Sequence, residues 1–134
     1  MSFTSVACSL LIRGDDLNKE SISNGLNLNP TNYILKGQQI KKTKFKAPKD
    51  IWTYEVKLVN EELPNTVLYN LISKLKHSKN YIINTSFEDI CIRLYLQSDL
   101  AQIYFDIEPN VLKELAELKI RFEVSILSWG GGRR

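Results

Sequence analysis

The sequence contains very few of the residues on which catalytic and metal sites usually depend. His77 is its single histidine, and Cys8 and Cys91 are its only cysteines. The two cysteines lie far apart, and no CxxC or Cys/His spacing surrounds either of them, so neither a disulfide framework nor a zinc site is indicated. We therefore expect no metal and no cofactor. We also expect both thiols to be reduced and buried within apolar strands.

Long apolar runs and a large charge excess are also missing, and there are only six glycines and four prolines. With 25% charged and 43% hydrophobic residues, the 134-residue chain has the composition of one compact globular domain. No stretch approaches the roughly 18 apolar residues of a membrane span, and the start MSFTSVACSLLIRG lacks the features of a signal peptide. We expect a cytoplasmic protein with no membrane partner. The net charge of +3 is too small to indicate binding of duplex nucleic acid.

Alternation of apolar and polar residues predicts five strands, at residues 4–13, 52–59, 89–97, 100–107 and 122–126. Helical spacing predicts three helices, at residues 18–25, within 63–79, and from Glu108-Pro109 onward. Asn18 is expected to cap the first helix and Gly25 to end it. Turn chemistry at Ser98-Asp99 predicts that the third and fourth strands pair as an antiparallel hairpin.

The resulting order, β-α-β-α-β-β-α-β, predicts an α+β domain with a mixed five-stranded sheet and helices on one face. Its last six elements would form a ferredoxin-like βαββαβ unit. We expect a single domain over residues 1–129 and a flexible tail at 130–134. The predicted core consists of Trp52, Tyr54, Val56, Leu58, Leu71, Leu75, Ile92, Leu94, Phe105, Leu115, Val124 and Ile126.

Several segments occur in an arrangement that resembles a known family. A strand ending in LIRGDDLN is followed by LNLNPT, YILKG, a tryptophan opening the strand IWTYEV, and the C-terminal segment VLKELAELKIRFEVSILSW. In this arrangement the chain resembles the bacterial family known as domain of unknown function 4279, from Ser5 to Trp129. The resemblance implies a small stand-alone bacterial domain, in a class that includes candidate immunity partners of secreted toxins. It implies no functional residues.

The supply of catalytic groups is poor. Acid/base catalysis requires a histidine or two facing carboxylates, and His77 falls on the polar face of its predicted helix. Adjacent carboxylates occur at 15–16, 61–62 and 88–89, but neighbours in a strand or helix point in different directions. The best placed are Asp15 and Asp16, in a turn after the first strand, where turn formation and helix entry are the competing explanation. We therefore expect that the protein is not an enzyme.

The segment from Lys36 to Lys49 is the one part of the chain with a clear excess of charge of one sign. We expect it to form a long exposed loop or hairpin. It contains Lys36, Lys41, Lys42, Lys44, Lys46 and Lys49, with Phe45 among them. Three interpretations remain open. The lysines could protect an edge strand from aggregation, contact a protein partner, or hold single-stranded nucleic acid together with aromatic stacking.

Our leading hypothesis is a non-enzymatic binding module, of the immunity type, that neutralises a bacterial toxin encoded next to it by stoichiometric binding. The lysine-rich segment and the adjoining Asp15/Asp16 turn would form the contact surface, and their proximity is itself a prediction. Opposite charges on neighbouring connections would steer a partner of mixed charge. The alternative is a nucleic-acid-binding accessory protein that uses residues 36–49. An enzyme with a carboxylate site near Asp15 and Asp16 is the least favoured hypothesis.

Overall fold

The computed structural model describes residues 3–40, 43–57, 63–100 and 102–128. Five strands form one sheet in the order β2-β3-β1-β4-β5. The strands are β1 (Ser5–Gly14), β2 (Asn32–Ile34), β3 (Asp50–Lys57), β4 (Asp89–Ser98) and β5 (Arg121–Ser128). The helices are α1 (Lys19–Leu26), α2 (Pro64–Leu75), the 3-10 turn η1 (Lys76–Ser78), α3 (Lys79–Asn84) and α4 (Pro109–Glu117).

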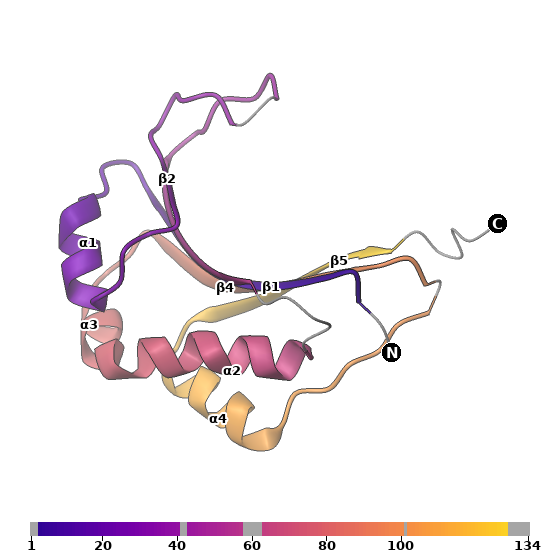
Figure 1. Ribbon diagram of the computed structural model, residues 1–134. Helices are drawn as coiled ribbons and strands as arrows, with labels where there is room; N and C mark the ends of the chain where they lie inside the picture. Colours follow the sequence, from indigo (N-terminus) through magenta and orange to yellow (C-terminus); the bar gives the residue numbers. More distant parts are fainter. Residues whose placement is uncertain (1–2, 41–42, 58–62, 101, 129–134) are drawn as a thin grey trace.

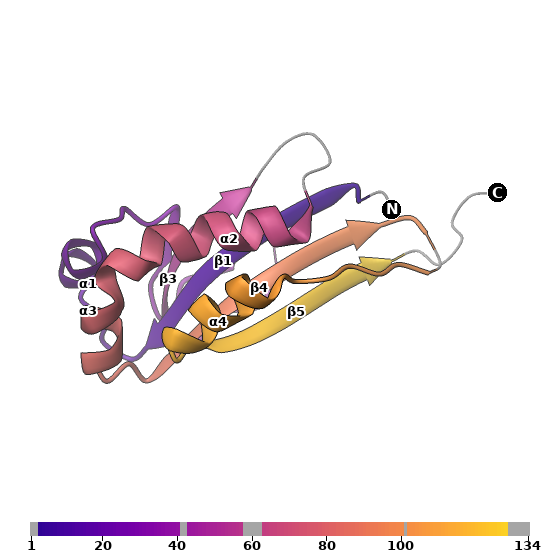
Figure 2. The same cartoon turned by 90° about the horizontal axis from the view of Figure 1, so that it is seen from below.

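All the helices lie on one side of the sheet, and the opposite side carries none of those described (Figures 1 and 2). The pairs β2–β3, β3–β1 and β1–β4 are antiparallel, whereas the pair β4–β5 is parallel. The sheet is therefore mixed. The predicted fold class, an α+β domain with a mixed five-stranded sheet and helices on one face, is confirmed.

The core lies between the sheet and α2. In the central strand β1, Cys8, Leu10 and Ile12 point toward the helices and are fully buried. Helix α2 buries Leu71 and Leu75 against them, because apolar residues recur along one side of this helix. Burying one such side chain contributes about 1.5–3 kcal/mol.

The fourth predicted strand, at 100–107, is wrong, and so is the hairpin it would form with β4. Residues 103–108 have no regular secondary structure and run as an extended connection from β4 to α4. Their alternation is real, since Ile103, Phe105 and Ile107 are partly buried against the core while the residues between them are exposed. An extended segment that packs one side on a core has the same period as a strand, without a strand's hydrogen-bonded partner.

The fifth strand of the sheet is instead β2, which pairs antiparallel with β3 through Tyr33 opposite Trp52. With only three residues, it is too short to show a period. The two strands at the C-terminal end of the chain, β4 and β5, are joined through α4, as a parallel pair requires a long crossover. The predicted order of elements is corrected accordingly to β-α-β-β-α-α-β-α-β, without the βαββαβ unit.

Helix α1 begins as predicted and ends differently. The side chain of Asn18 accepts a hydrogen bond from the backbone N–H of Ser21, at 2.9 Å, and so caps the helix. Gly25 does not end it, because the helix continues to Leu26 and the left-handed cap residue is Asn27, with φ of 56°. Asparagine adopts this conformation more readily than most residues, which lets it take the position that glycine usually occupies.

Most of the predicted core is confirmed. Seven of the twelve residues are buried: Trp52, Val56, Leu71, Leu75, Ile92, Leu94 and Leu115. Tyr54 and Phe105 are partly buried, and Leu58 lies outside the described residues, as does the predicted tail at 130–134. The prediction is wrong for Val124 and Ile126, which are 42% and 50% exposed, because β5 is an edge strand and α4 lies beside its start only (Figure 2).

Candidate functional site

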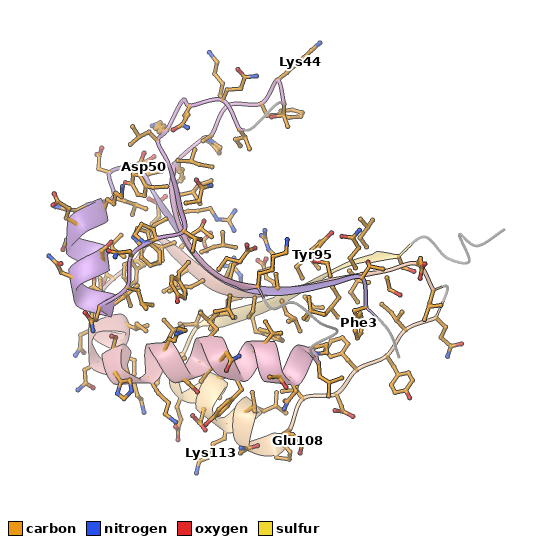
Figure 3. All side chains as sticks on the ribbon, viewed as in Figure 1. Phe3, Lys44, Asp50, Tyr95, Glu108 and Lys113 are labelled. Atoms are coloured by element: carbon orange, nitrogen blue, oxygen red, sulfur yellow. The ribbon has the colours of Figure 1, made fainter. Side chains whose placement is uncertain are left out.

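A hairpin between β2 and β3 projects from the helix-free side of the sheet, and we call its residues 35–40 and 43–49 the arm (Figure 1). Its two legs are joined by hydrogen bonds from Ala47 N to Gln38 O at 2.8 Å and from Ile40 N to Phe45 O at 2.9 Å. Figure 3 shows Lys44 at its far end. The arm confirms the predicted exposed loop or hairpin, while Lys41 and Lys42 lie outside the described residues.

The base of the arm is attached to the body by a buried carboxylate. Asp50, only 7% exposed at the start of β3, accepts hydrogen bonds from Lys36 N at 2.7 Å and Leu17 N at 3.1 Å. A buried charge is tolerated only when donors satisfy it, and Asp50 has two. It thereby links the arm to the β1–α1 turn.

Ionic contacts join this base to the same turn. Lys36 Nζ lies 3.5 Å from Asp15 Oδ1, and Lys49 Nζ lies 3.9 Å from Asp15 Oδ2. Lys49 also pairs with Glu88, which precedes β4. The predicted proximity of the lysine-rich segment to the Asp15 turn is thus a feature of the fold.

A second series of ion pairs crosses the helix-free face of the sheet. The side chain of Asp89 lies 3.2 Å from Arg13 Nε and 2.8 Å from Arg121 Nη1. Glu123 then accepts from Arg121 at 2.9 Å and from Arg93 at 3.0 Å. Strand register aligns these residues, since Arg13 is opposite Asp89, and Arg93 is opposite Glu123.

The two series adjoin at the neighbouring residues Glu88 and Asp89, and we call them together the ionic belt, which runs from the arm to the edge strand β5. Its members are Lys36, Asp15, Lys49, Glu88, Asp89, Arg13, Arg121, Glu123 and Arg93. Each of its side chains is between about one quarter and three fifths exposed, so the individual pairs contribute little to stability. The belt presents both signs of charge to a partner.

The belt lowers the pKa of one of its carboxylates, Glu123. The pKa of Glu123 is held below its usual range by the hydrogen bonds from Arg121 and, second, from Arg93. The hydrogen bond to Asp89 and, second, the bonds to Glu123 raise the pKa of Arg121. A carboxylate with a lowered pKa is a poor proton donor at neutral pH, so Glu123 is not suited to general acid catalysis.

Between the arm and the sheet lies a pocket of about 420 Å³, which we call the root pocket. The apolar part of its wall comes from Ile40 and Pro48 of the arm and Ile51 of β3. Its charged lining consists of the belt residues Arg13, Lys49, Glu88 and Asp89. Pockets of this size hold a small molecule or one large side chain.

The end of the arm carries an aromatic residue with little protein around it. Phe45 is 75% exposed and stands between the exposed Lys44 and Lys46. Its backbone is held by Thr43, whose hydroxyl accepts a hydrogen bond from Phe45 N at 3.2 Å. The ring is therefore presented on a hydrogen-bonded turn.

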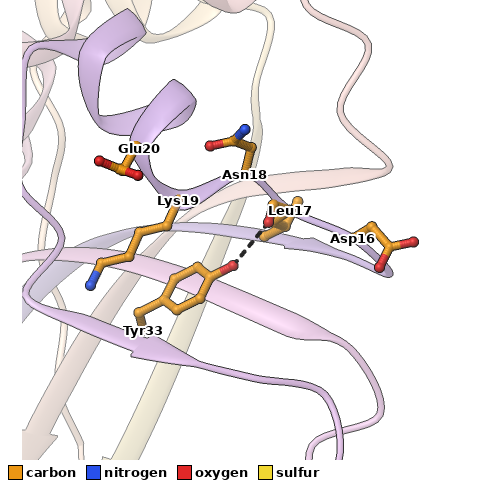
Figure 4. Close-up of a pocket in the computed structure, with 6 residues that line it drawn as sticks. All are labelled: Asp16, Leu17, Asn18, Lys19, Glu20 and Tyr33. Carbon is orange, nitrogen blue, oxygen red and sulfur yellow. Dashed lines mark hydrogen bonds between the residues drawn. The ribbon is translucent and has the colours of Figure 1, made fainter.

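Asp16 does not join the belt. It lines a shallow depression with Leu17, Asn18, Lys19, Glu20 and Tyr33 (Figure 4). There Tyr33 donates a hydrogen bond to Leu17 O at 3.2 Å, and Lys19 Nζ lies 5.5 Å from the centre of the Tyr33 ring. These contacts hold the start of α1 against β2, so the depression is explained by packing.

The remaining candidates for chemistry are accounted for by the fold. His77 is exposed on η1, as predicted. Cys8 and Cys91 are free thiols, both buried. Among the described residues, no group of three or more His, Cys, Asp or Glu side chains is placed to hold a metal ion. Nor does any helix in the described parts of the chain have the length and hydropathy to span a membrane.

The sequence patterns did not reveal the part of the ionic belt that lies on the sheet. Arg13, Arg93 and Glu123 each occupy a polar position in an alternating strand, which is the signal that could have placed them on the solvent side. Strand order could not be inferred, however, so nothing brought β1, β4 and β5 together. Glu88 and Asp89 were recognised as a pair, and the structure directs them to different cations.

The chain belongs to the family described as Domain of unknown function (DUF4279), whose sequence model matches residues 3–129. The match covers nearly the whole chain and agrees with the resemblance drawn from LIRGDDLN and the C-terminal segment. No curated protein and no solved structure gave a significant match. The arrangement of residues described above is therefore the basis for assigning a function.

Proposed function

We propose that this domain is a non-catalytic binding module that holds a partner protein in fixed stoichiometry, with the arm and the adjoining helix-free face of the sheet as contact surface. The observation that carries the proposal is Phe45, 75% exposed at the end of an arm that projects from the body. Aromatic residues, phenylalanine included, are enriched at the centre of protein interfaces, where a few residues carry most of the binding energy. The arm gives Phe45 such a support.

The ionic belt favours a protein over a nucleic acid as the partner. Anions at Asp15, Glu88 and Glu123 stand among the cations of the same surface, and they would repel a phosphate backbone. A surface of mixed charge selects a partner with the complementary arrangement and speeds its association. It also penalises proteins whose charges meet their own sign.

We further propose that the partner is a bacterial toxin encoded next to this gene and that the domain is its immunity protein, acting in the cytoplasm. The small size of the domain and the free, buried thiols Cys8 and Cys91 support this proposal, since free thiols are typical of reducing compartments. Inhibition would result from occupying the toxin's surface. No residue of the domain needs to perform chemistry.

The direct test is titration calorimetry of the purified domain against the product of the neighbouring gene, at low and at moderate salt. We expect one-to-one binding that persists at the higher salt, because a standard protein interface buries apolar as well as charged surface. Rescue of cell growth on co-expression would identify the partner as a toxin. Absence of binding to that product would contradict the toxin proposal.

A nucleic-acid-binding function is the second candidate, favoured by one observation. Phe45 stands between Lys44 and Lys46, a combination that can stack a base and neutralise the flanking phosphates. Binding of single-stranded RNA with a steep salt dependence, abolished by Lys44→Glu/Lys46→Glu, would support this function and replace the first.

A further inference from the structure

The root pocket combines an apolar wall with charged groups. Its carboxylates already have partners within the protein, whereas one of its cations has hydrogen-bond donors to spare. Both of its carboxylates are engaged through both oxygens. Asp89 contacts Arg121 through Oδ1 and Arg13 through Oδ2. Glu88 accepts a hydrogen bond from Asp15 N at 3.2 Å and pairs with Lys49 through its other oxygen. The anions of the pocket are therefore satisfied by the protein itself.

Of the two cations of the pocket, Lys49 pairs with Asp15 and Glu88, whereas Arg13 is less completely engaged. Arg13 Nε is buried and makes no hydrogen bond within the described part of the chain, although Asp89 lies 3.2 Å away as an ionic partner. A guanidinium has five N–H donors, and Arg13 donates none of them to the described residues. Its side chain is 33% exposed. Arg13 thus lines the pocket with guanidinium donors other than the buried Nε, and an acceptor could still use them.

We propose that the root pocket binds a carboxylate carried on an apolar stem. The carboxylate would accept hydrogen bonds from the Arg13 guanidinium, which fits its planar geometry. The stem would pack on Ile40, Pro48 and Ile51. Two sources supply this chemistry: an acidic side chain of the partner protein and a free organic acid. In the first case the inference rests on the proposed function.

The test uses the intact domain and small probes, monitored by the backbone amide resonances of the pocket residues. The probes are hexanoate as the free acid, hexylamine with the same stem and opposite charge, acetate without a stem, and a blocked peptide with one glutamate between leucines. Hexanoate and the peptide should each shift the resonances of Lys49 and Ile51 to saturation. Whichever of the two probes binds more tightly identifies the source of the carboxylate, a free acid or a partner's side chain. Acetate and hexylamine should give no saturable shift.

Two arginines provide a matched pair of variants. Arg13 and Arg93 both lie on the helix-free face and both pair with a carboxylate, but only Arg13 lines the pocket. Arg13→Gln should weaken hexanoate binding by about tenfold or more, since a charged hydrogen bond is lost. Arg93→Gln should leave it unchanged. A second variant, Ile40→Asp, lies in the arm away from the core and should abolish binding by repulsion.

The proposal is overturned if neither hexanoate nor the peptide saturates, if hexylamine binds as tightly as hexanoate, or if Arg13→Gln and Arg93→Gln bind alike. These outcomes concern the pocket alone, because no partner protein is present in the titration. Failure of the proposed function would appear separately, as absence of binding to the neighbouring gene product by a domain whose pocket still binds hexanoate.

Discussion

The ring of Tyr81 lies directly across Gly25, so closely that a Cβ atom on this glycine would come within 2.3 Å of the ring. Tyr81 belongs to α3 and Gly25 to α1, so the contact fixes how the two helices meet. Tyr81 itself is held edge-on against Phe87, with ring centroids 6.0 Å apart. Glycine is required here for space and not to end the helix.

Gly25→Ala should therefore destabilise the domain, although alanine is the better helix former by about 1 kcal/mol. Overpacking against Tyr81 should cost about 1–3 kcal/mol, measured by urea unfolding. Asn24→Ala, at an exposed position of the same helix, is the control and should be neutral or stabilising. In a Tyr81→Ala background, the Gly25 change should lose its effect. An equally stable Gly25→Ala protein would disprove the contact.

The core account is tested at Leu71, which is fully buried in α2. Leu71→Ala should lower the free energy of unfolding by about 2–5 kcal/mol, since it removes apolar contacts and leaves a cavity. Leu112→Ala makes the same chemical change on α4, where Leu112 is 48% exposed, and should cost far less. Similar losses for both variants would mean that α2 does not pack as described.

The buried thiols predict slow chemical labelling. Cys8 and Cys91 are both inaccessible to solvent. Under native conditions neither should react with iodoacetamide, and both should react once the chain is unfolded, because the thiolate must form and be reached. Mass spectrometry distinguishes the outcomes. If both cysteines remain unlabelled after unfolding, they form a disulfide. If they are labelled rapidly under native conditions, the thiols are exposed.

The stability of the domain should fall at alkaline pH through Cys8. Burial raises the pKa of Cys8 from 9.0 to about 12, while a hydrogen bond from the Ser9 backbone opposes the shift. The unfolded chain thus loses this proton before the folded one does. The stabilisation is complete below pH 9 and is lost between pH 9 and about 12, at about 1.4 kcal/mol per pH unit. Cys8→Ala should show a shallower alkaline decline in urea unfolding, and an identical decline would reject the assignment.

The sequence predicts those parts of the fold that are determined by residues close together in the chain. Periodicity located β1 and α2 because one buried side dictates it along the whole element. It misplaced a strand at 100–107, since Ile103 and Phe105 alternate with exposed residues for packing reasons alone. Pairing partners are a property of the whole chain, and no local pattern reports them.

The candidate site shows the same division. Lysine content and turn chemistry identified the arm and the Asp15 turn, and both lie where predicted relative to each other. Arg121 and Glu123 were missed as site residues because their role depends on β5 lying beside β4. The reading of Gly25 as a helix end failed for a related reason, since its real neighbour, Tyr81, is distant in sequence.

Charge reversal in the arm should slow association with a partner without unfolding the domain. Lys44→Glu/Lys46→Glu changes two exposed residues that make no ion pair among the described residues. The association rate with the neighbouring gene product should fall and its salt dependence change, while the melting temperature stays the same. Lys74→Glu/Lys113→Glu, on the helical side, is the matched control and should leave the rate unaltered. A drop in melting temperature for the arm variant alone would point to a structural role.

The central claim is that the partner binds to the arm, and Phe45 and Tyr104 allow the most direct measurement of it. Both are aromatic and almost equally exposed, at 75% and 71%, but Tyr104 lies in the connection between β4 and α4, which runs away from the arm (Figure 1). Titration calorimetry with the partner should give a dissociation constant about thirtyfold higher or more for Phe45→Ala, the cost of losing an interface hot spot. Tyr104→Ala should bind like the parent. Unchanged binding by Phe45→Ala, or an equal loss for Tyr104→Ala, would contradict the account.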